Sequence, residues 1–239
     1  TTIATATGGN FETLVIDTSA ASTSVSDDVD ATSVTLSATP SVAEGGAIVY
    51  TATLTNAAQT PVSVTLSSGQ TITIAANATS GSISIAAPGE DVYLDAGSVS
   101  RTIASATGGN FESLTVNPAA AVTSITDTID TTTVSITGDA AVAEGSTAAY
   151  TVSLTSPAQT AVTVNLTYSG VAADGTDFNG VASLTIPANA SSASFNIATL
   201  ADVLAEGAES FTVAIANAAG GNFEGLVISA TNGAQTTSI

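Results

Sequence analysis

Apolar and polar residues alternate along most of this chain. Between positions 48 and 54, Ile48, Tyr50, Ala52 and Leu54 occupy every second position. A period of two turns one face of a β-strand toward a core and the other toward water. Turn residues such as Gly, Asn and Pro separate the alternating segments. The pattern predicts strands near residues 34–36, 48–54, 62–66, 72–74, 83–85, 99–104 and 114–116.

The same series of segments recurs about 100 residues later in the chain. Residues 34–66 realign on residues 134–166 at an offset of 100, and the peptide Gly-Gly-Asn-Phe-Glu occurs at 8–12, 108–112 and 220–224. A repeat of this length indicates an array of similar units. Seven short strands in about 100 residues are typical of an immunoglobulin-like sandwich. We therefore expect an all-β chain of tandem immunoglobulin-like Greek-key β-sandwiches. The second series of strands is expected near 134–136, 150–154, 162–166, 184–186, 195–197, 211–215 and 226–228.

Short acidic links divide the chain into units. Asp127-Thr-Ile-Asp130 precedes the second series of strands, and Asp27-Asp-Val-Asp30 precedes the first. The expected domains are residues 31–130 and 131–239, each a sandwich repeat. Residues 1–30 match residues 101–130 and are expected to be the last two strands and the link of a preceding repeat, in a piece of a longer polypeptide. Because two isolated strands are marginally stable in water, a neighbouring chain could complete them by strand addition.

The composition is strongly acidic. The 239 residues include 20 Asp and Glu but a single basic residue, Arg101, and the formal charge is −19. This argues against nucleic acids and anionic membranes as partners, because such surfaces are bound by clustered Lys and Arg. No apolar run reaches the roughly 20 residues of a membrane-spanning helix. Without Cys there are no disulfides, and bound metal is the usual substitute in small extracellular domains.

Catalysis has little support in this sequence. The chain has no His, Cys or Lys to serve as a base or nucleophile near neutral pH. A glycosidase could work with two carboxylates, but aromatic residues are 4% of the chain and Trp is absent, so a sugar-stacking platform is not expected. We therefore expect a non-catalytic protein.

Most of the acids are expected at one pole of each sandwich. If the strands run up and down, the turn after the first strand, the loops after the third and fifth strands, and the exit link all share one end. These places hold Glu44, Glu90, Asp91, Asp95, Asp127 and Asp130 in the first repeat, and Glu144, Asp174, Asp177, Asp202, Glu206 and Glu209 in the second. Asp27, Asp28 and Asp30 hold the corresponding place for the unit before residue 31.

Such an accumulation of negative charge favours a divalent cation. Ca²⁺ accepts six to eight carboxylate and carbonyl oxygens, whereas Zn²⁺ and Cu²⁺ are disfavoured where His and Cys are absent. We predict that Ca²⁺ bridges the loops of one repeat to its exit link and stiffens the joint. The alternative is that these acids only keep the surface soluble and prevent pairing of sheet edges.

The Gly-Gly-Asn-Phe-Glu motif is expected at the opposite pole. Its glycines permit the positive φ that a hairpin turn requires, so the motif is interpreted as structural. Phe11, Phe111 and Phe223 are interpreted as side chains that close the end of the core beside the last strand. Tyr50 and Tyr150 alternate with apolar neighbours and are also expected in the core.

Three segments resemble the Calx-β family of calcium-binding sandwiches: Ala143-Glu-Gly145, Gly175-Thr-Asp-Phe178 and Asp202-Val-Leu-Ala-Glu-Gly-Ala-Glu209. The resemblance implies calcium ligands at Glu144, Asp177, Asp202, Glu206 and Glu209, and at Glu44, Asp91 and Asp95 in the first repeat. The first repeat departs from the pattern because it lacks an acid in the loop after its third strand.

Nearly the whole chain also resembles the extender repeats of large adhesion proteins. The resemblance rests on residues 34–50, which begin Val-Thr-Leu-Ser-Ala-Thr-Pro, and on the Gly-Gly-Asn-Phe-Glu motifs. These proteins are giant RTX-type biofilm adhesins that pseudomonads and related Gram-negative bacteria export by type I secretion. The resemblance implies a spacer on the bacterial cell surface, extracellular, with neighbouring repeats of the same polypeptide as its partners. Two alternatives stay open: a calcium-dependent glycan- or protein-binding module, and a subunit of a surface layer or filament.

Overall fold

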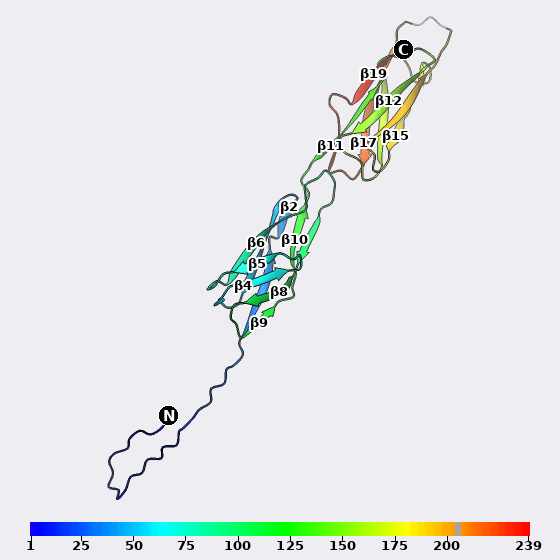
Figure 1. Ribbon diagram of the computed structural model, residues 1–239. Coiled ribbons are helices and arrows are strands. Elements are labelled where there is room, and N and C mark those ends of the chain that lie inside the picture. The colour runs from blue at the N-terminus through cyan, green and yellow to red at the C-terminus, as the bar shows by residue number, and fades with distance from the viewer. Residues whose placement is uncertain (204–206) are drawn as a thin grey trace.

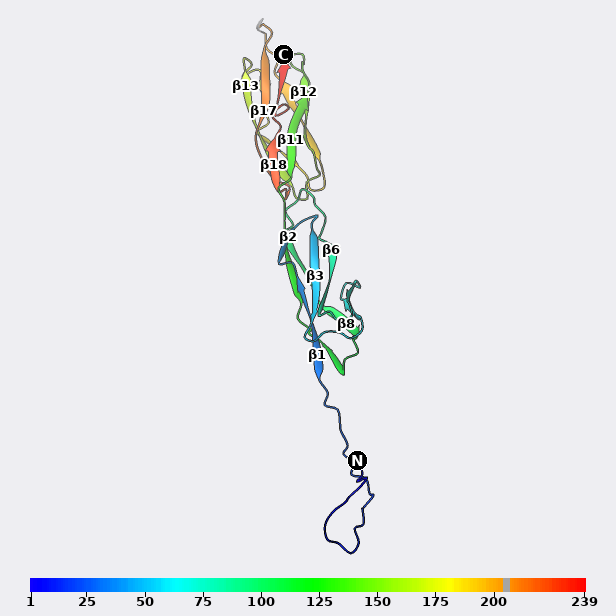
Figure 2. The same ribbon diagram turned by 90° about the vertical axis from the view of Figure 1, so that its left-hand side faces the viewer.

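Strands are the only regular elements in residues 1–203 and 207–239, which the computed structural model describes. They form two β-sandwiches placed end to end behind an extended N-terminal segment (Figure 1). Seen from the side, the two sandwiches continue along one long axis (Figure 2). No helix of the described residues is long and apolar enough to cross a membrane. The expected all-β fold of tandem sandwiches is confirmed.

The first repeat packs two layers of strands around one core. One layer has the order β6-β3-β1-β9, and the other is formed by β5-β4-β8 together with β2-β10-β7. Buried Ile48 and Tyr50 from the first layer meet Val62 and Val64 from the second. The strands are β1 (Ala31–Ala38), β2 (Ser41–Ala43), β3 (Ala47–Leu54), β4 (Val62–Leu66), β5 (Thr71–Ile74), β6 (Ser80–Ala86), β7 (Gly97–Arg101), β8 (Ile103–Gly108), β9 (Ser113–Val116) and β10 (Ala121–Thr126).

The second repeat has the same plan. One layer has the order β14-β16-β12-β11-β18, and the other β15-β13-β17-β19. Phe178 and Phe211 stack in its core with ring centroids 4.2 Å apart. Its strands are β11 (Thr131–Gly138), β12 (Thr147–Leu154), β13 (Val162–Gly170), β14 (Phe178–Asn179), β15 (Ser183–Ile186), β16 (Ser192–Thr199), β17 (Ser210–Gly220), β18 (Gly225–Ile228) and β19 (Ala234–Ser238).

The last strand of each repeat changes layers, which the alternation did not predict. In the first repeat β9 pairs in parallel with β1, whereas β10 pairs antiparallel with β7 in the other layer. Strand β10 turns Ala121, Thr123 and Ile125 inward. Its buried face thus mixes small and polar residues, so its hydrophobic period is weak. This crossing delivers the chain to the end of the sandwich, where the exit link begins.

The two tyrosines expected in the core are there. Tyr50 and Tyr150 are buried in their respective cores. Tyr150 stacks on Phe195 with centroids 5.2 Å apart, and its hydroxyl shares a short hydrogen bond with the Thr237 hydroxyl of β19. Buried phenols usually have such a partner, whereas the buried Tyr50 hydroxyl makes no hydrogen bond within the described residues. The Tyr150 bond ties the returning last strand to the centre of the sandwich.

Residues 1–30 form no strand in the structure. Almost all of their side chains are exposed, and Thr1 and Ala21 exchange the two backbone hydrogen bonds that close this segment on itself. A strand pair needs a sheet face to bury its apolar residues, and none covers this segment. The assignment of these residues to the end of a preceding repeat therefore stays a prediction.

Candidate metal centre

The joint between the two repeats gathers three segments of the first repeat. They are the β2–β3 turn, the β6–β7 loop and the exit link after β10. The Glu44 N–H donates to the Thr126 carbonyl at 3.1 Å, and the Gly45 N–H donates to the Pro88 carbonyl at 2.7 Å. The Thr128 hydroxyl makes a short hydrogen bond to the Glu90 carboxylate. These bonds hold the turn, the loop and the link together at the pole that faces the second repeat.

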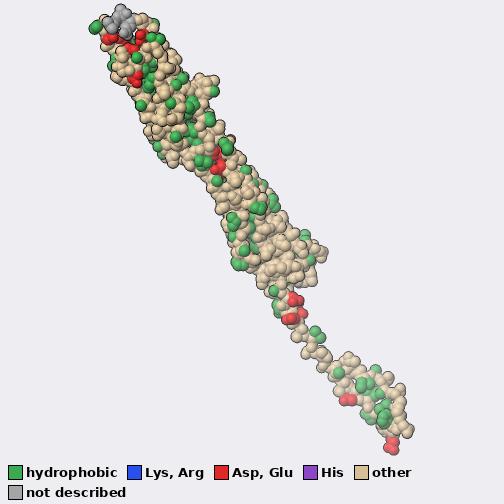
Figure 3. All heavy atoms as spheres, turned by 180° about the vertical axis from the view of Figure 1, so that it is seen from behind, with side chains coloured by type: hydrophobic (Ala, Val, Ile, Leu, Met, Phe, Trp, Pro, Cys, Tyr) green, Lys and Arg blue, Asp and Glu red, His purple; other side chains and the backbone are tan. Residues whose placement is uncertain are grey.

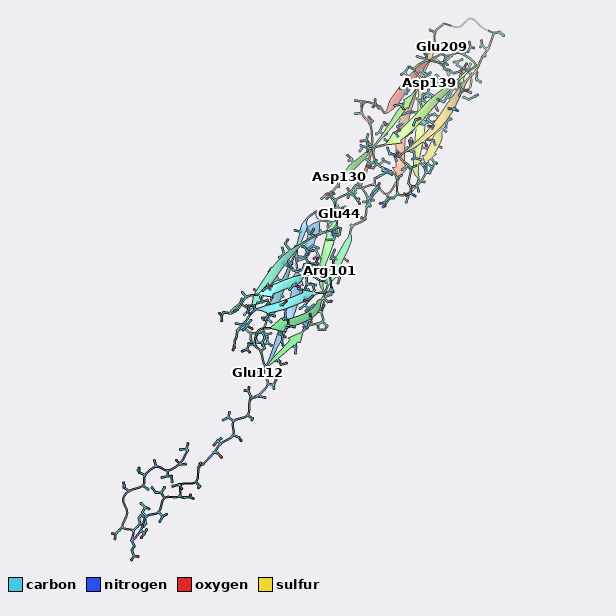
Figure 4. The ribbon with its side chains drawn as sticks, viewed as in Figure 1. Glu44, Arg101, Glu112, Asp130, Asp139 and Glu209 are labelled. Carbon is cyan, nitrogen blue, oxygen red and sulfur yellow. The ribbon has the colours of Figure 1, made fainter. Side chains whose placement is uncertain are left out.

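Acidic side chains are visible at this joint, at the far tip of the second repeat and at the lower end of the first (Figure 3). At the joint, Glu44, Asp127 and Glu224 each present a carboxylate oxygen, and these oxygens lie within 4.8 Å of one another. Glu44 and Asp127 belong to the first repeat, and Glu224 belongs to the second. Glu44 and Asp130 are both labelled at this joint in Figure 4. We call Glu44, Asp127 and Glu224 the joint cluster.

The joint cluster contains buried oxygens without partners. Glu44 is 5% exposed. Its Oε2, together with Asp127 Oδ1 and Glu224 Oε1, is buried and makes no hydrogen bond within the chain. A buried carboxylate oxygen without a partner is costly, and three that converge repel one another as well. The arrangement is the one expected of oxygen ligands for a cation.

Two further acids surround the joint cluster. A side-chain hydrogen bond with Asp95, together with burial, raises the pKa of Glu44 to about 7, and the nearby charges of Asp95, Asp127 and Asp91 add to the effect. The first-repeat acids Glu44, Asp91, Asp95 and Asp127 are thus brought together as the sequence predicted. Without a cation, the raised pKa leaves Glu44 protonated in a substantial fraction of molecules near neutral pH.

This pKa predicts an inverted pH dependence of stability for the metal-free chain. The pKa of Glu44 is raised from 4.5 to about 7 on folding, so its stabilising contribution is complete below about 4.5 and is lost as the pH rises through about 7. In EDTA, we expect a higher Tm at about pH 5.5 than at about pH 8, and Glu44→Gln should flatten this difference. A thermal melt at stepped pH measures it. A wild-type Tm that stays constant or rises over this range would contradict the assignment.

Glu224 is a candidate ligand that the sequence analysis missed. It comes from the third Gly-Gly-Asn-Phe-Glu motif, which was interpreted as a purely structural turn. The turn itself is as expected, since Gly220, Gly221 and Asn222 all have positive φ. The motif also carries Glu224, whose Oε2 accepts the Asp130 N–H at 2.7 Å. The available signal was the conservation of Glu among the three copies of the motif within this chain. In a tandem array, the far pole of one repeat faces the acidic pole of the repeat before it.

An apolar contact lies beside the joint cluster. Tyr93, from the β6–β7 loop, stacks on Phe223 with ring centroids 5.6 Å apart, and its hydroxyl donates to the Pro157 carbonyl at 2.7 Å. The backbone of the loop pairs with the motif: the Leu94 N–H donates to Asn222 O at 3.0 Å, and the Glu224 N–H donates to Val92 O at 3.0 Å. Phe223 therefore closes the joint as well as packing against the core of its own repeat.

Several predicted acids lie outside the joint cluster. Asp130 contributes its N–H to Glu224. Asp27 and Asp28 lie exposed in the N-terminal segment, and the Asp30 N–H donates to Glu112 at 2.6 Å.

At the far pole of the second repeat, the acids make local hydrogen bonds. Glu144 accepts the Asp202 N–H at 2.9 Å. Asp177 accepts the Ala173 N–H, and Asp174 accepts the Gly180 N–H. Glu209 exchanges backbone hydrogen bonds with Ile239, and Glu206 lies outside the described residues. Among the described residues these carboxylates form no group comparable to the joint cluster, so ligand roles at this pole stay predictions.

Comparisons with known proteins give one family and several solved structures. The family model of the LapA domain matches residues 30–128 and again residues 130–239. Among curated proteins, none matches the chain. The apo form of the Calx CBD1 domain is 23% identical with a TM-score of 0.40, over 46% of this chain and 96% of that chain. The CBD12 structures of CALX1.2 and CALX1.1 are 14% and 15% identical with TM-scores of 0.37 and 0.39. Both cover 84% of this chain, and 98% and 96% of their own.

Proposed function

The chain belongs to the LapA domain family, a family of large adhesins, and on this premise we propose that its repeats are calcium-stiffened extenders of a giant bacterial surface adhesin. In this role they are non-catalytic and project an adhesive region away from the cell in support of adhesion and biofilm formation. The rod-like succession of sandwiches supports the proposal (Figure 1). So does the absence of His, Cys and Lys, the residues that most often serve as bases or nucleophiles near neutral pH.

The observation that carries the proposal is the set of unpaired buried oxygens contributed by both repeats. Glu44, Asp127 and Glu224 would hold the ion, with Asp95 beside Glu44. The donors are all hard carboxylate oxygens, which suits Ca²⁺, and no nitrogen or sulfur ligand is present to favour a transition metal. A bound Ca²⁺ would supply positive charge that offsets the repulsion among these acids.

The ligands come from three separate segments, which explains how binding would stiffen the joint. Glu44 lies in the β2–β3 turn, Asp127 in the link and Glu224 in the second repeat. Opening the joint would withdraw Glu224 from the other two. An ion that binds the closed arrangement more tightly stabilises that arrangement by mass action. Calcium should therefore reduce bending between repeats and leave the individual sandwiches unchanged.

Calcium should raise the Tm of the chain and narrow its distribution of shapes. We expect the maximum dimension from small-angle X-ray scattering to increase and the Tm to rise when Ca²⁺ is added to EDTA-treated protein. Half-saturation is expected at roughly 10⁻⁴ to 10⁻³ M, as in extracellular calcium modules. Mg²⁺, which demands a smaller octahedral site, serves as the control. If EDTA and Ca²⁺ samples give the same Tm and the same scattering curve, the calcium role is wrong.

A further inference from the structure

The β6–β7 loop of the first repeat packs against a defined site on the second repeat. Tyr93 lies against Phe223 and Pro157, and the backbone of Val92 and Leu94 pairs with the Gly-Gly-Asn-Phe-Glu motif. An isolated antiparallel bridge joins Tyr93 to Phe223. Asn222 supports the motif by donating from Nδ2 to Gln159 Oε1 at 2.7 Å and to Leu94 O at 3.3 Å. These contacts involve ring stacking and backbone hydrogen bonds and need no metal.

The first repeat carries the corresponding docking site, but no loop of the described residues packs into it. A cavity of about 240 Å³ lies at the pole of the first repeat that points toward residues 1–30. We call it the socket; its lining includes Asn56, Ala57, Gln59, Asn110, Phe111 and Glu112. Phe111 and Glu112 correspond to Phe223 and Glu224 of the motif, and Ala57 corresponds to Pro157 at the offset of 100.

The hydrogen bonds within the socket match those of the corresponding site on the second repeat, which the β6–β7 loop occupies. Asn110 donates to Gln59 Oε1 at 2.7 Å, as Asn222 does to Gln159. Glu112 accepts the Asp30 N–H at 2.6 Å, as Glu224 accepts that of Asp130 at 2.7 Å. The Phe of the occupied site is more buried than the Phe of the socket, as expected. Phe223 is 7% exposed, whereas Phe111 is only partly buried. The socket is therefore built before anything fills it.

We propose that the socket is the docking site for the loop after the fifth strand of a repeat that precedes residue 30 in the same polypeptide, with an aromatic side chain in the place of Tyr93. Residues 1–30 repeat residues 101–130, including a four-residue acidic link of the same length. Glu112 accepts a hydrogen bond from the backbone of this link, as Glu224 does from the link at the joint. The acidic pole of the preceding repeat would therefore face the socket. By correspondence with Pro157 and Phe223, the Ala57 carbonyl would accept the incoming hydroxyl and the Phe111 ring would stack on the incoming aromatic side chain. The docking extends the proposed spacer by a contact that is independent of calcium.

The test completes the preceding repeat by placing a copy of residues 31–100 before Thr1 of the full chain. The Glu224 N–H donates to Val92 O at the existing joint, so the Glu112 N–H should gain the same bond. We expect amide hydrogen exchange at Glu112 to slow at least about tenfold relative to the 239-residue chain, in EDTA as well as in Ca²⁺. Exchange at Glu112 that stays fast while Glu224 is protected would overturn the proposal. Protection at Glu112 that persists when Ca²⁺ fails to raise the Tm would leave the socket standing and the calcium role refuted.

A second variant covers the case in which the added residues do not fold. Here residues 31–130 are duplicated after Asp130, so that both copies have complete sandwiches. Because the chain has no Cys, Tyr93→Cys in the first copy and Ala57→Cys in the second form a unique pair. We expect an intramolecular disulfide at a rate within a few-fold of the Tyr93→Cys, Pro157→Cys pair at the existing joint. No disulfide when the Tyr93→Cys, Pro157→Cys pair at the existing joint does form one would overturn the assignment. A disulfide that forms only between chains in a concentration-dependent way would also overturn it and would identify a second copy as the occupant.

Discussion

Glu224→Gln should weaken calcium binding at the joint by at least about tenfold. Glu224 is the only member of the joint cluster that belongs to the second repeat, and its Oε1 is buried without a partner beside Glu44 and Asp127. The substitution keeps the size of the side chain and an oxygen for the Asp130 N–H, but it removes the negative charge. Loss of about 1.4 kcal/mol of binding free energy corresponds to the tenfold change. Isothermal titration calorimetry with Ca²⁺ on the full chain measures it.

Glu112→Gln is the matched control for this experiment. Glu112 occupies the same place in the second copy of the motif and accepts the Asp30 N–H, but no group of carboxylates includes it among the described residues. We expect its calcium titration to match that of the wild type. Should Glu224→Gln bind as tightly as Glu112→Gln, the joint cluster is not the calcium site. In metal-free protein, Glu224→Gln should also raise the Tm, because it removes one of the repelling charges.

Tyr93→Ala should loosen the joint when no metal is bound. The substitution removes the stack on Phe223 and the hydrogen bond to the Pro157 carbonyl, both of which cross between the repeats. Tyr93 is partly buried, and aromatic anchors at interfaces cost about 2 kcal/mol when truncated, which corresponds to roughly 30-fold in the ratio of closed to open joints. Spin labels on one introduced Cys in each repeat, read by pulsed dipolar spectroscopy in EDTA, would show a broadened distance distribution.

Two neighbouring substitutions separate the parts of this effect. Leu94→Ala is the control, because the Leu94 side chain is 55% exposed and only its backbone bonds to Asn222. Tyr93→Phe keeps the ring stack and loses the hydroxyl bond, so it should cost about 1 kcal/mol. The order of broadening should be Tyr93→Ala, then Tyr93→Phe, then Leu94→Ala. Equal distributions for Tyr93→Ala and Leu94→Ala would show that the stack does not hold the joint.

The joint thus combines two kinds of contact with different sensitivities. The stack of Tyr93 on Phe223 is apolar and insensitive to salt and chelator. The joint cluster is electrostatic: its charges would oppose closure when it is fully ionised, and under the proposed function a bound cation would offset them and support closure. A chain of such joints would stay assembled without calcium and become rigid with it.

Much of the fold could be predicted from the sequence. Alternating residues such as Ile48, Tyr50 and Ala52 place one face inside, and this local period located all seven predicted strands of the second repeat and six of the seven in the first. The strand predicted at 99–104 is in fact two, because β7 ends at Arg101 and β8 begins at Ile103 in another sheet. The alternation did not predict β10 or β19. The buried face of β10 mixes Ala121 and Thr123 with Ile125, and the buried residue of β19 is Thr237, so neither strand shows a clear hydrophobic period. The short period also assigned Glu44, Asp95 and Asp127 to one pole, since strand direction alone decides which turns share an end.

What the sequence determined by itself was the strand pattern, the repeat and the gathering of first-repeat acids at one pole, because these follow from local periodicity and the alternation of strand direction. The tertiary structure alone decided how two poles meet. It showed that Glu224 completes the cluster, that Tyr93 docks beside Phe223, and that the same place on the first repeat is open. These contacts join residues that lie far apart in the chain, such as Tyr93 with Phe223 and Glu44 with Glu224. Their geometry depends on how one folded surface fits another, which no local pattern encodes.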